Sequence, residues 1–139
     1  EMGIEGMIFD LDNTLIKPKT AVLEENIRAW LDAVHGEGFK TMVVSNNKKL
    51  DYVAETEKII NIPSIGYAKK PQKACFYKAL EVLELEAHQV AVIGDRPLTD
   101  ILGGQRIGAY TILVDPLAKL TEPWYIKGLR ALERSLIQR

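Results

Sequence analysis

The feature that most constrains the fold of this 139-residue chain is a regular alternation of short apolar runs with segments of helical periodicity. Apolar runs of four to seven residues, typical of buried strands, occupy 6–10, 39–45, 64–68, 90–93 and 110–114. Segments with helical spacing lie between them, at about 20–36, 48–60, 71–83 and 98–107. Strands that alternate with helices form a parallel sheet covered on both faces. We therefore predict a three-layer α/β domain with a mainly parallel five-stranded sheet.

Local signals suggest where two of these helices begin. Thr20, which follows Pro18, is predicted to cap the first helix. Pro71 suits the first position of the third helix, where a missing N–H costs nothing. The predicted core faces of these two helices consist of Leu23, Ile27, Trp30, Leu31 and Val34, and of Phe76, Ala79, Leu80 and Leu83.

Composition excludes several classes of protein. Hydrophobic residues make up 47% and charged residues 27% of the chain, as in an ordinary globular domain and unlike a disordered tail. A net charge of −1 argues against nucleic acid as a partner. The single cysteine, Cys75, cannot form an internal disulfide, and we see neither a secretion signal nor an apolar run that could span a bilayer. We expect one domain over 1–139 in the cytoplasm.

Polar side chains gather where the predicted strands end. Ligands of parallel α/β sheets bind beyond the carboxyl ends of the strands, so these positions are the candidate site. They are Asp10, Asp12 and Thr14 after the first strand, Ser45, Asn46 and Asn47 after the second, Lys69 and Lys70 after the third, and Asp95 and Asp100 after the fourth.

This set of residue types points to phosphate chemistry. Several carboxylates at one rim repel each other and need a cation, and their oxygens suit Mg²⁺. A cation, a lysine and a hydroxyl together can hold phosphate oxygens. One carboxylate could then attack phosphorus, while a second, two residues later, acts as the acid and base.

The motifs and their order resemble the haloacid-dehalogenase-like (HAD) phosphatase superfamily. The matching segments, spread over most of the chain, are Asp10-Leu11-Asp12-Asn13-Thr14-Leu15, Val43-Val44-Ser45-Asn46-Asn47, Lys69-Lys70-Pro71 and Gly94-Asp95 through Thr99-Asp100. Within the superfamily, the chain is similar to the YqeG-type branch of subfamily IIIA, which resembles phosphatidylglycerophosphate phosphatases. The resemblance implies a Rossmann-like, HAD-like domain.

The resemblance also implies a role for each matching residue. Asp10 would be the nucleophile, Asp12 the general acid and base, Ser45 a phosphoryl ligand and Lys70 the neutralising cation, with Lys69 as the alternative to Lys70. Mg²⁺ would bind Asp10, Asp12 through its main-chain carbonyl, and Asp95, with Asp100 assisting directly or through water. Thr14 and Asn46 would support phosphate binding. Arg96 is assigned no role.

The spacing between the motifs indicates what size of substrate the site could accept. Ser45 follows Asp12 by 33 positions and Lys70 follows Ser45 by 25, and both intervals are already filled by predicted elements. No cap domain fits, so we expect a bulky substrate or a neighbouring subunit, in a homo-oligomer, as the lid. Lysines on the segments that leave the strand ends would attract an anion. They are Lys17, Lys19, Lys48, Lys49, Lys69, Lys70 and Lys73.

The segment after the fifth predicted strand leaves two alternatives open. A helix at about 122–138, with a basic excess and an apolar face, could touch an anionic membrane surface or simply pack on the sheet. The substrate is likewise open between phosphatidylglycerophosphate and a soluble sugar or nucleotide phosphate.

Two non-enzymatic readings compete with a phosphatase. A receiver domain of two-component signalling also uses Mg²⁺, a phosphorylated aspartate and a lysine, but its phospho-acceptor follows the third strand, where this chain has Ala68-Lys69. A non-catalytic scaffold would not need the second acid, Asp12. Both are retained as alternatives to a magnesium-dependent phosphate monoester hydrolase.

Overall fold

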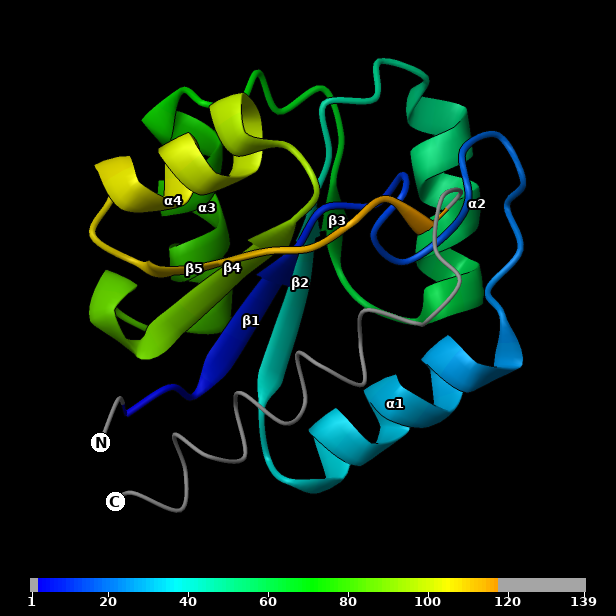
Figure 1. Cartoon of the computed structure of the whole chain (residues 1–139), viewed down its shortest axis with the longest axis horizontal. Coiled ribbons are helices and arrows are strands. Elements are labelled where there is room, and N and C mark those ends of the chain that lie inside the picture. Colours follow the sequence, from blue (N-terminus) through cyan, green and yellow to red (C-terminus); the bar gives the residue numbers. More distant parts are fainter. Residues whose placement is uncertain (1–2, 118–139) are drawn as a thin grey trace.

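The computed structural model describes residues 3–117 as a five-stranded parallel sheet between two layers of helices (Figure 1). The strands are β1 (Gly6–Phe9), β2 (Lys40–Val44), β3 (Ser64–Ile65), β4 (Val90–Gly94) and β5 (Tyr110–Leu113). The helices are α1 (Glu25–Gly36), α2 (Leu50–Ile60), α3 (Lys73–Leu83) and α4 (Leu102–Arg106), with a 3-10 turn at Ala87–Gln89 and a π-helical turn at Pro97–Ile101. The strand order is β3-β2-β1-β4-β5, and every pairing is parallel. The predicted α/β class is confirmed.

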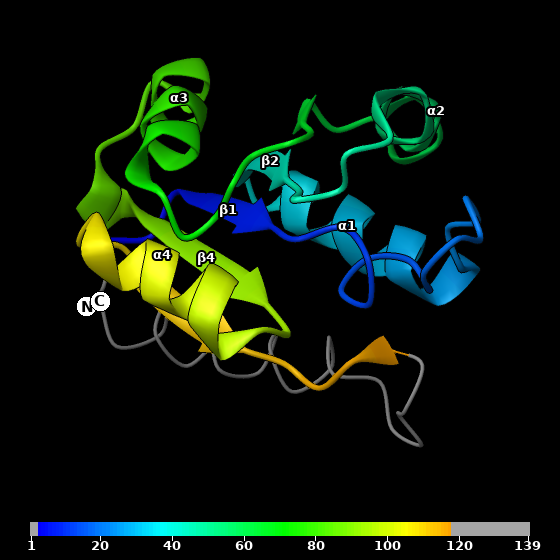
Figure 2. The same cartoon turned by 90° about the horizontal axis from the view of Figure 1, so that it is seen from above.

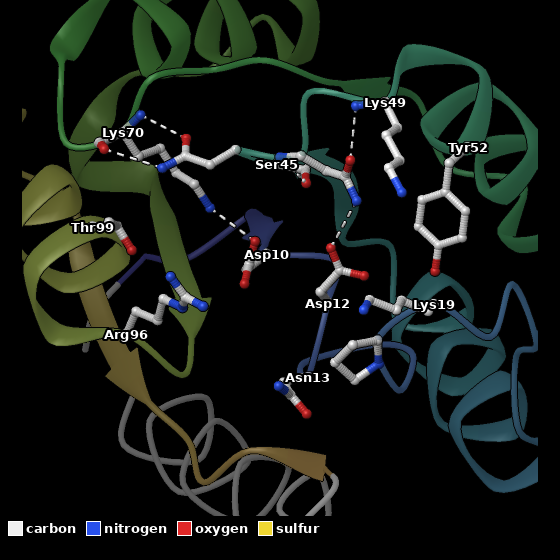
Figure 3. A pocket seen from close by; sticks show the side chains of 13 residues that line it. Asp10, Asp12, Asn13, Lys19, Ser45, Lys49, Tyr52, Lys70, Arg96 and Thr99 are labelled. Atoms are coloured by element: carbon white, nitrogen blue, oxygen red, sulfur yellow. Dashed lines mark hydrogen bonds and ion pairs between the residues drawn. The ribbon is translucent and has the colours of Figure 1, made fainter.

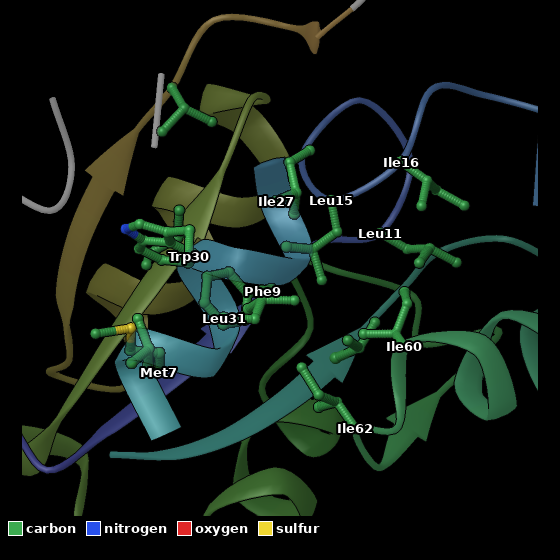
Figure 4. Packing of buried hydrophobic residues seen from close by; sticks show 14 of the residues in the cluster. Met7, Phe9, Leu11, Leu15, Ile16, Ile27, Trp30, Leu31, Ile60 and Ile62 are labelled. Atoms are coloured by element: carbon green, nitrogen blue, oxygen red, sulfur yellow. The ribbon is translucent and has the colours of Figure 1, made fainter. Parts of the chain in front are cut away.

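The two faces of the sheet bury different sets of residues. Successive strand side chains point to opposite faces, so Met7 and Phe9 of β1 face one core while Ile8 faces the other. The first core packs against α1, where Trp30 meets Phe9 edge-to-face with ring centroids 5.7 Å apart (Figure 4). The second core packs against α3 and α4, which lie apart from α1 in both views of the molecule (Figures 1 and 2). Strands β1 and β4 contribute side chains to both cores, so both faces of these strands are covered.

The start of the first helix differs from the sequence prediction. Helix α1 begins at Glu25 rather than next to Thr20, because the Thr20 hydroxyl donates to the Lys17 carbonyl at 2.7 Å and closes a turn instead. Lys19 and Ala21 have positive φ angles of 65° and 49°, which a helix does not allow. Leu23 therefore packs against the core from the loop and not from a helix.

The start of the third helix is also corrected. Helix α3 begins at Lys73 with Gln72 as its N-cap, so Pro71 lies before the helix and is joined to Lys70 by a cis peptide bond. The predicted core face of α3 is confirmed, since Phe76, Ala79, Leu80 and Leu83 are all buried. The predicted helix over 98–107 exists as the π-helical turn followed by α4.

Within residues 3–117 each crossover from one strand to the next is a short connection with helical turns, and none contains a cap domain. Within these residues no inserted domain covers the edge of the sheet at which the strands end. The described residues include no helix long and apolar enough to cross a membrane. The helix predicted at about 122–138 lies outside the described residues.

Candidate active site

A cleft of about 570 Å³ opens at the carboxyl ends of the central strands (Figure 3). Asp10 and Asp12 line it from the end of β1, Ser45 and Asn46 from the end of β2, and Lys70 from the segment between β3 and α3. Parallel pairing brings these separated segments together, because every strand points its carboxyl end to the same edge. The cleft has the size of an ordinary small-molecule site.

The end of β1 and the loop that follows it place Asp10 and Asp12 in different ways. The Asp10 amide still donates to the Ile93 carbonyl at 3.0 Å, so Asp10 extends the strand. The chain then turns sharply, with the amides of Leu15 and Ile16 both donating to the Leu11 carbonyl and Asn13 at φ 66°. Asp12 therefore leaves the line of the strand and points into the cleft beside Asp10 (Figure 3).

Lys70 is the buried cation of the site. Its ammonium donates to Asp10 Oδ1 at 2.9 Å, to Asp100 Oδ1 at 2.5 Å and to the Val44 carbonyl at 2.7 Å, which occupies all three of its N–H groups. Burial alone would lower its pKa, but Asp10 and Asp100 outweigh burial and raise the pKa of Lys70 above its usual value. Lys69 is exposed and lies over the Tyr67 ring instead. Lys70 is therefore the lysine that reaches the acids.

Asn46 fixes the backbone of Lys70. Its side-chain oxygen accepts from the Lys70 amide at 2.7 Å, and its side-chain nitrogen donates to the Lys70 carbonyl at 3.1 Å. The Asn46 side chain thus joins the end of β2 to the segment that carries the lysine.

Asn47 is a residue to which the sequence analysis gave no role. Its side-chain nitrogen donates to Asp12 Oδ2 at 3.1 Å, and its side-chain oxygen accepts from the Lys49 amide at 2.8 Å. The only sequence signal was its place directly after Ser45-Asn46 at a strand end. In the structure it orients the Asp12 carboxyl group.

The environment of Asp12 favours its protonated form. Burial raises the pKa of Asp12 most, and Asp10 adds to the increase, while the Asn47 hydrogen bond partly offsets it. Its Oδ1 atom is buried and makes no hydrogen bond within the described residues. A carboxyl group with a raised pKa beside a second carboxylate suits proton donation.

Asp10, Asp95 and Asp100 form a compact acidic cluster. One carboxylate oxygen of each lies within 4.8 Å of the others. Burial and the neighbouring Asp10 raise the pKa of Asp95 to about 6, and its buried Oδ1 makes no hydrogen bond within the described residues. Clustered carboxylates with an unpartnered buried oxygen fit a hard divalent cation. The Asp12 side chain is not part of this cluster, as expected if Asp12 serves a metal only through its main-chain carbonyl.

Asp100 is the most buried acid of the cluster, with 1% of its surface exposed. Its two oxygens accept from the Lys70 ammonium and from the Arg96 amide, at 2.5 and 3.3 Å. Gly94 allows this close approach, because a Cβ at that position would collide with the Asp100 carboxyl group. Asp100 therefore belongs both to the acidic cluster and to the ion pair with Lys70.

Ser45 and Thr14 differ in their access to the cleft. Ser45 lines the cleft, and its hydroxyl oxygen accepts from the Asn47 amide at 3.0 Å. Thr14 is completely buried and is not among the residues that line the cleft. A direct contact between Thr14 and a bound phosphate is therefore not favoured by this arrangement.

The predicted lysine cluster divides into groups. Lys19, Lys49 and Lys70 line the cleft. Lys48 lies over the Tyr67 ring with Lys69, and Lys17 forms an exposed ion pair with Glu24 at 3.4 Å. Arg96, to which the sequence analysis gave no role, also lines the cleft (Figure 3).

Comparisons with known proteins agree with this geometry. Residues 67–116 match the family described as HAD-hydrolase-like. The chain is 35% identical to a probable phosphatase, YqeG, of Bacillus subtilis over 99% of this chain and 78% of that protein. It is 32% identical to the chloroplastic phosphatidylglycerophosphate phosphatase 1 of Chlamydomonas reinhardtii, over 99% of this chain but only 54% of the alga's protein. A haloacid-dehalogenase-like hydrolase from Xanthomonas campestris superposes over the full length of both chains with a TM-score of 0.71 and 12% identity, which supports the fold.

Proposed function

This chain belongs to the haloacid-dehalogenase-like phosphatases, and from that membership we propose that it hydrolyses a phosphate monoester through an aspartyl-phosphate on Asp10. The observation that supports this most is the convergence of Asp10, Asp12 and the buried Lys70 at one open cleft. A structural ion pair alone would not need a second, separately oriented carboxyl group beside the first.

In the first step a carboxylate oxygen of Asp10 attacks phosphorus, and the bond from phosphorus to the leaving oxygen breaks. Asp12, whose pKa is raised by burial, gives its proton to that leaving oxygen. In the second step Asp12 takes a proton from water as the water oxygen attacks phosphorus. The bond to Asp10 then breaks and inorganic phosphate leaves.

The other residues would orient and neutralise the phosphoryl group. The Ser45 hydroxyl lies in the cleft and can donate to a phosphoryl oxygen, because the contact from the Asn47 amide uses its oxygen and not its hydrogen. The Lys70 ammonium donates to Asp10 at 2.9 Å and would neutralise negative charge beside the attacked phosphorus. Asn46 keeps Lys70 in place, and Thr14 is fully buried in the loop that follows Asp12.

We propose Mg²⁺ as the cofactor, held by Asp10, Asp95 and the main-chain carbonyl of Asp12, with Asp100 in support. The donor set consists of oxygens only, which favours a hard cation over zinc. When bound, the ion would neutralise phosphoryl oxygens and the crowded carboxylates.

The substrate is proposed to be a phosphomonoester with a large or lipid leaving group, with phosphatidylglycerophosphate as the first candidate. The open edge of the sheet and the name of the algal relative support it. That relative is nearly twice as long as the matched segment, so a soluble sugar or nucleotide phosphate is the second candidate. A lipid substrate would require peripheral contact with an anionic membrane.

The test is phosphate release from a generic aryl phosphate with Mg²⁺, followed by a panel of lipid and soluble phosphomonoesters. Asp10→Asn should abolish turnover while circular dichroism shows an unchanged fold. Beryllium fluoride should attach to Asp10, whereas attachment elsewhere would favour a receiver-like module. Turnover retained by Asp10→Asn would remove Asp10 as the nucleophile.

A further inference from the structure

The wall of the cleft beyond Asp12 carries positive charge that the proposed chemistry does not use. Lys19 and Lys49 line the cleft there together with Tyr52, on the side of Asp12 away from Asp10 (Figure 3). Neither lysine forms an ion pair with any residue in the range 3–117. Lys70, by contrast, has all its donors engaged at the other end of the cleft.

Both lysines are attached to the site through specific backbone contacts. The Lys49 amide donates to Asn47 Oδ1 at 2.8 Å, and the same Asn47 side chain donates to Asp12 Oδ2 at 3.1 Å. Lys49 and the proposed general acid therefore share one positioning side chain. The Tyr52 hydroxyl accepts from the Ala21 amide at 3.4 Å, which ties the loop of Lys19 to helix α2.

The position of this wall relative to Asp12 identifies what it would contact. A general acid must touch the leaving oxygen, so a group attached to that oxygen extends past Asp12. Arg96 and Thr99 lie on the opposite side, next to Asp10, where the transferred phosphoryl group would sit (Figure 3). The cleft, at about 570 Å³, has room for both parts of such a substrate.

We propose that Lys19, Lys49 and Tyr52 form a subsite for a second anionic group, on the leaving-group side of the substrate. The inference rests on the proposed phosphatase function and adds the substrate class: a phosphomonoester whose leaving group itself carries a phosphate. The lysines bind the second phosphate, and the Tyr52 ring packs against the carbon chain between the two phosphates. Two kinds of compound have this chemistry: a phosphodiester lipid that also carries a terminal phosphomonoester, and a soluble polyol with two phosphates.

The experiment compares three soluble substrates: p-nitrophenyl phosphate, glycerol phosphate, and glycerol phosphate bearing a methyl phosphodiester on its far carbon. The wild-type protein should prefer the last, and the preference should fall as sodium chloride rises. Lys19→Met/Lys49→Met should raise KM for the diester substrate about three- to tenfold, because each exposed charge contact contributes modestly, with little change for the other two.

Lys58→Met/Lys78→Met is the matched control, since both lysines are exposed, lie outside the cleft and remove the same charge. This control should leave the diester preference intact. If both double variants lost the diester preference equally, the preference would come from general electrostatic attraction, and the subsite would be overturned. A preference that survives in Lys19→Met/Lys49→Met would overturn it as well.

A final arm separates the two sources of the second phosphate. Phosphatidylglycerophosphate in neutral detergent micelles should show the same dependence on the two lysines if the lipid is a substrate. If the wild-type protein hydrolyses none of the substrates, the proposed function fails. If it hydrolyses substrates with and without the second phosphate equally well, only the subsite fails.

Discussion

At the scale of single residues, the site is organised by two adjacent asparagines with separate tasks. Asn46 binds both backbone polar groups of Lys70, and Asn47 binds the Asp12 carboxyl group. One strand end thus positions both the cation and the second acid. Their effects on activity should be separable by substitution.

Asn47→Asp keeps an oxygen for the Lys49 amide but removes the donor to Asp12. Because a buried polar group left without its hydrogen bond costs about 1–3 kcal/mol, and the new carboxylate also repels Asp12, we expect kcat to fall roughly 10- to 100-fold. Steady-state kinetics on the aryl phosphate would measure this. Gln105→Glu, the same chemical change at an exposed position of α4, should leave kcat unaltered. An Asn47→Asp variant with wild-type kcat would show that Asn47 does not position Asp12.

Lys70 and Lys69 offer a second matched pair. Lys70→Met leaves Asp10 and Asp100 without their buried counter-charge, and breaking a buried pair costs about 3–5 kcal/mol of unfolding free energy. Lys69→Met changes an exposed side chain and should cost no more than about 0.5 kcal/mol. Urea denaturation of both variants without metal compares them. Equal midpoints would mean that the buried ion pairs contribute little to stability.

At the scale of elements, the approach of α4 to the sheet places the acids that follow β4. A Cβ at Gly104 would lie 2.6 Å from Thr111 Cγ2 and 3.1 Å from Val92 Cβ, so α4 packs tightly on β4 and β5. The π-helical turn that carries Asp100 directly precedes this contact. The position of Asp100 therefore depends on how closely α4 packs against the sheet.

Gly104→Val should push α4 away from the sheet and destabilise the fold by about 1–3 kcal/mol, as overpacking does. It should also lower activity, because Asp100 moves with the turn. Gly36→Ala serves as the control, because a Cβ there meets nothing within 4 Å and alanine is favourable in a helix. Thermal melting and phosphate release of the two variants are the measurements. Wild-type stability of Gly104→Val would contradict the tight packing.

At the scale of the whole molecule, the acidic cluster links folding to pH and to metal. Burial and Asp10 raise the pKa of Asp95 to about 6, compared with its ordinary value of 3.8. The folded chain therefore holds this proton more tightly than the unfolded chain, so stability without metal falls as pH rises from about 4 to about 6. A divalent cation competes with the proton for the same carboxylate.

We expect Mg²⁺ to raise the melting temperature more at pH 7.5 than at pH 5, because at pH 5 the cation must displace a proton. Scanning fluorimetry with EDTA or Mg²⁺ at both pH values measures the difference. Asp95→Asn should reduce the Mg²⁺-dependent increase at pH 7.5. A larger stabilisation at pH 5 than at pH 7.5 would contradict a metal site at these acids.

Much of the architecture followed from local pattern. Apolar runs such as Val90–Gly94 and helical spacing such as Phe76 to Leu83 gave the right elements, because periodicity reports directly which side chains are buried. The helix start near Thr20 was wrong, since a hydroxyl that can cap a helix can equally close a turn. Pro71 was expected at the first position of a helix and instead lies two residues before α3.

The sequence by itself determined which acids, which hydroxyl and which pair of lysines lie at one edge of the sheet. These residues follow directly after strands, and parallel strands all end at the same edge. Only the tertiary structure decided how they divide the work. Lys70 and not Lys69 contacts the acids, and Thr14 is buried away from the cleft. Asn47 orients Asp12, and Arg96 is added to the residues that line the cleft. Such choices depend on side-chain directions set by loops and by packing between distant segments, and neither propensity nor spacing carries that information.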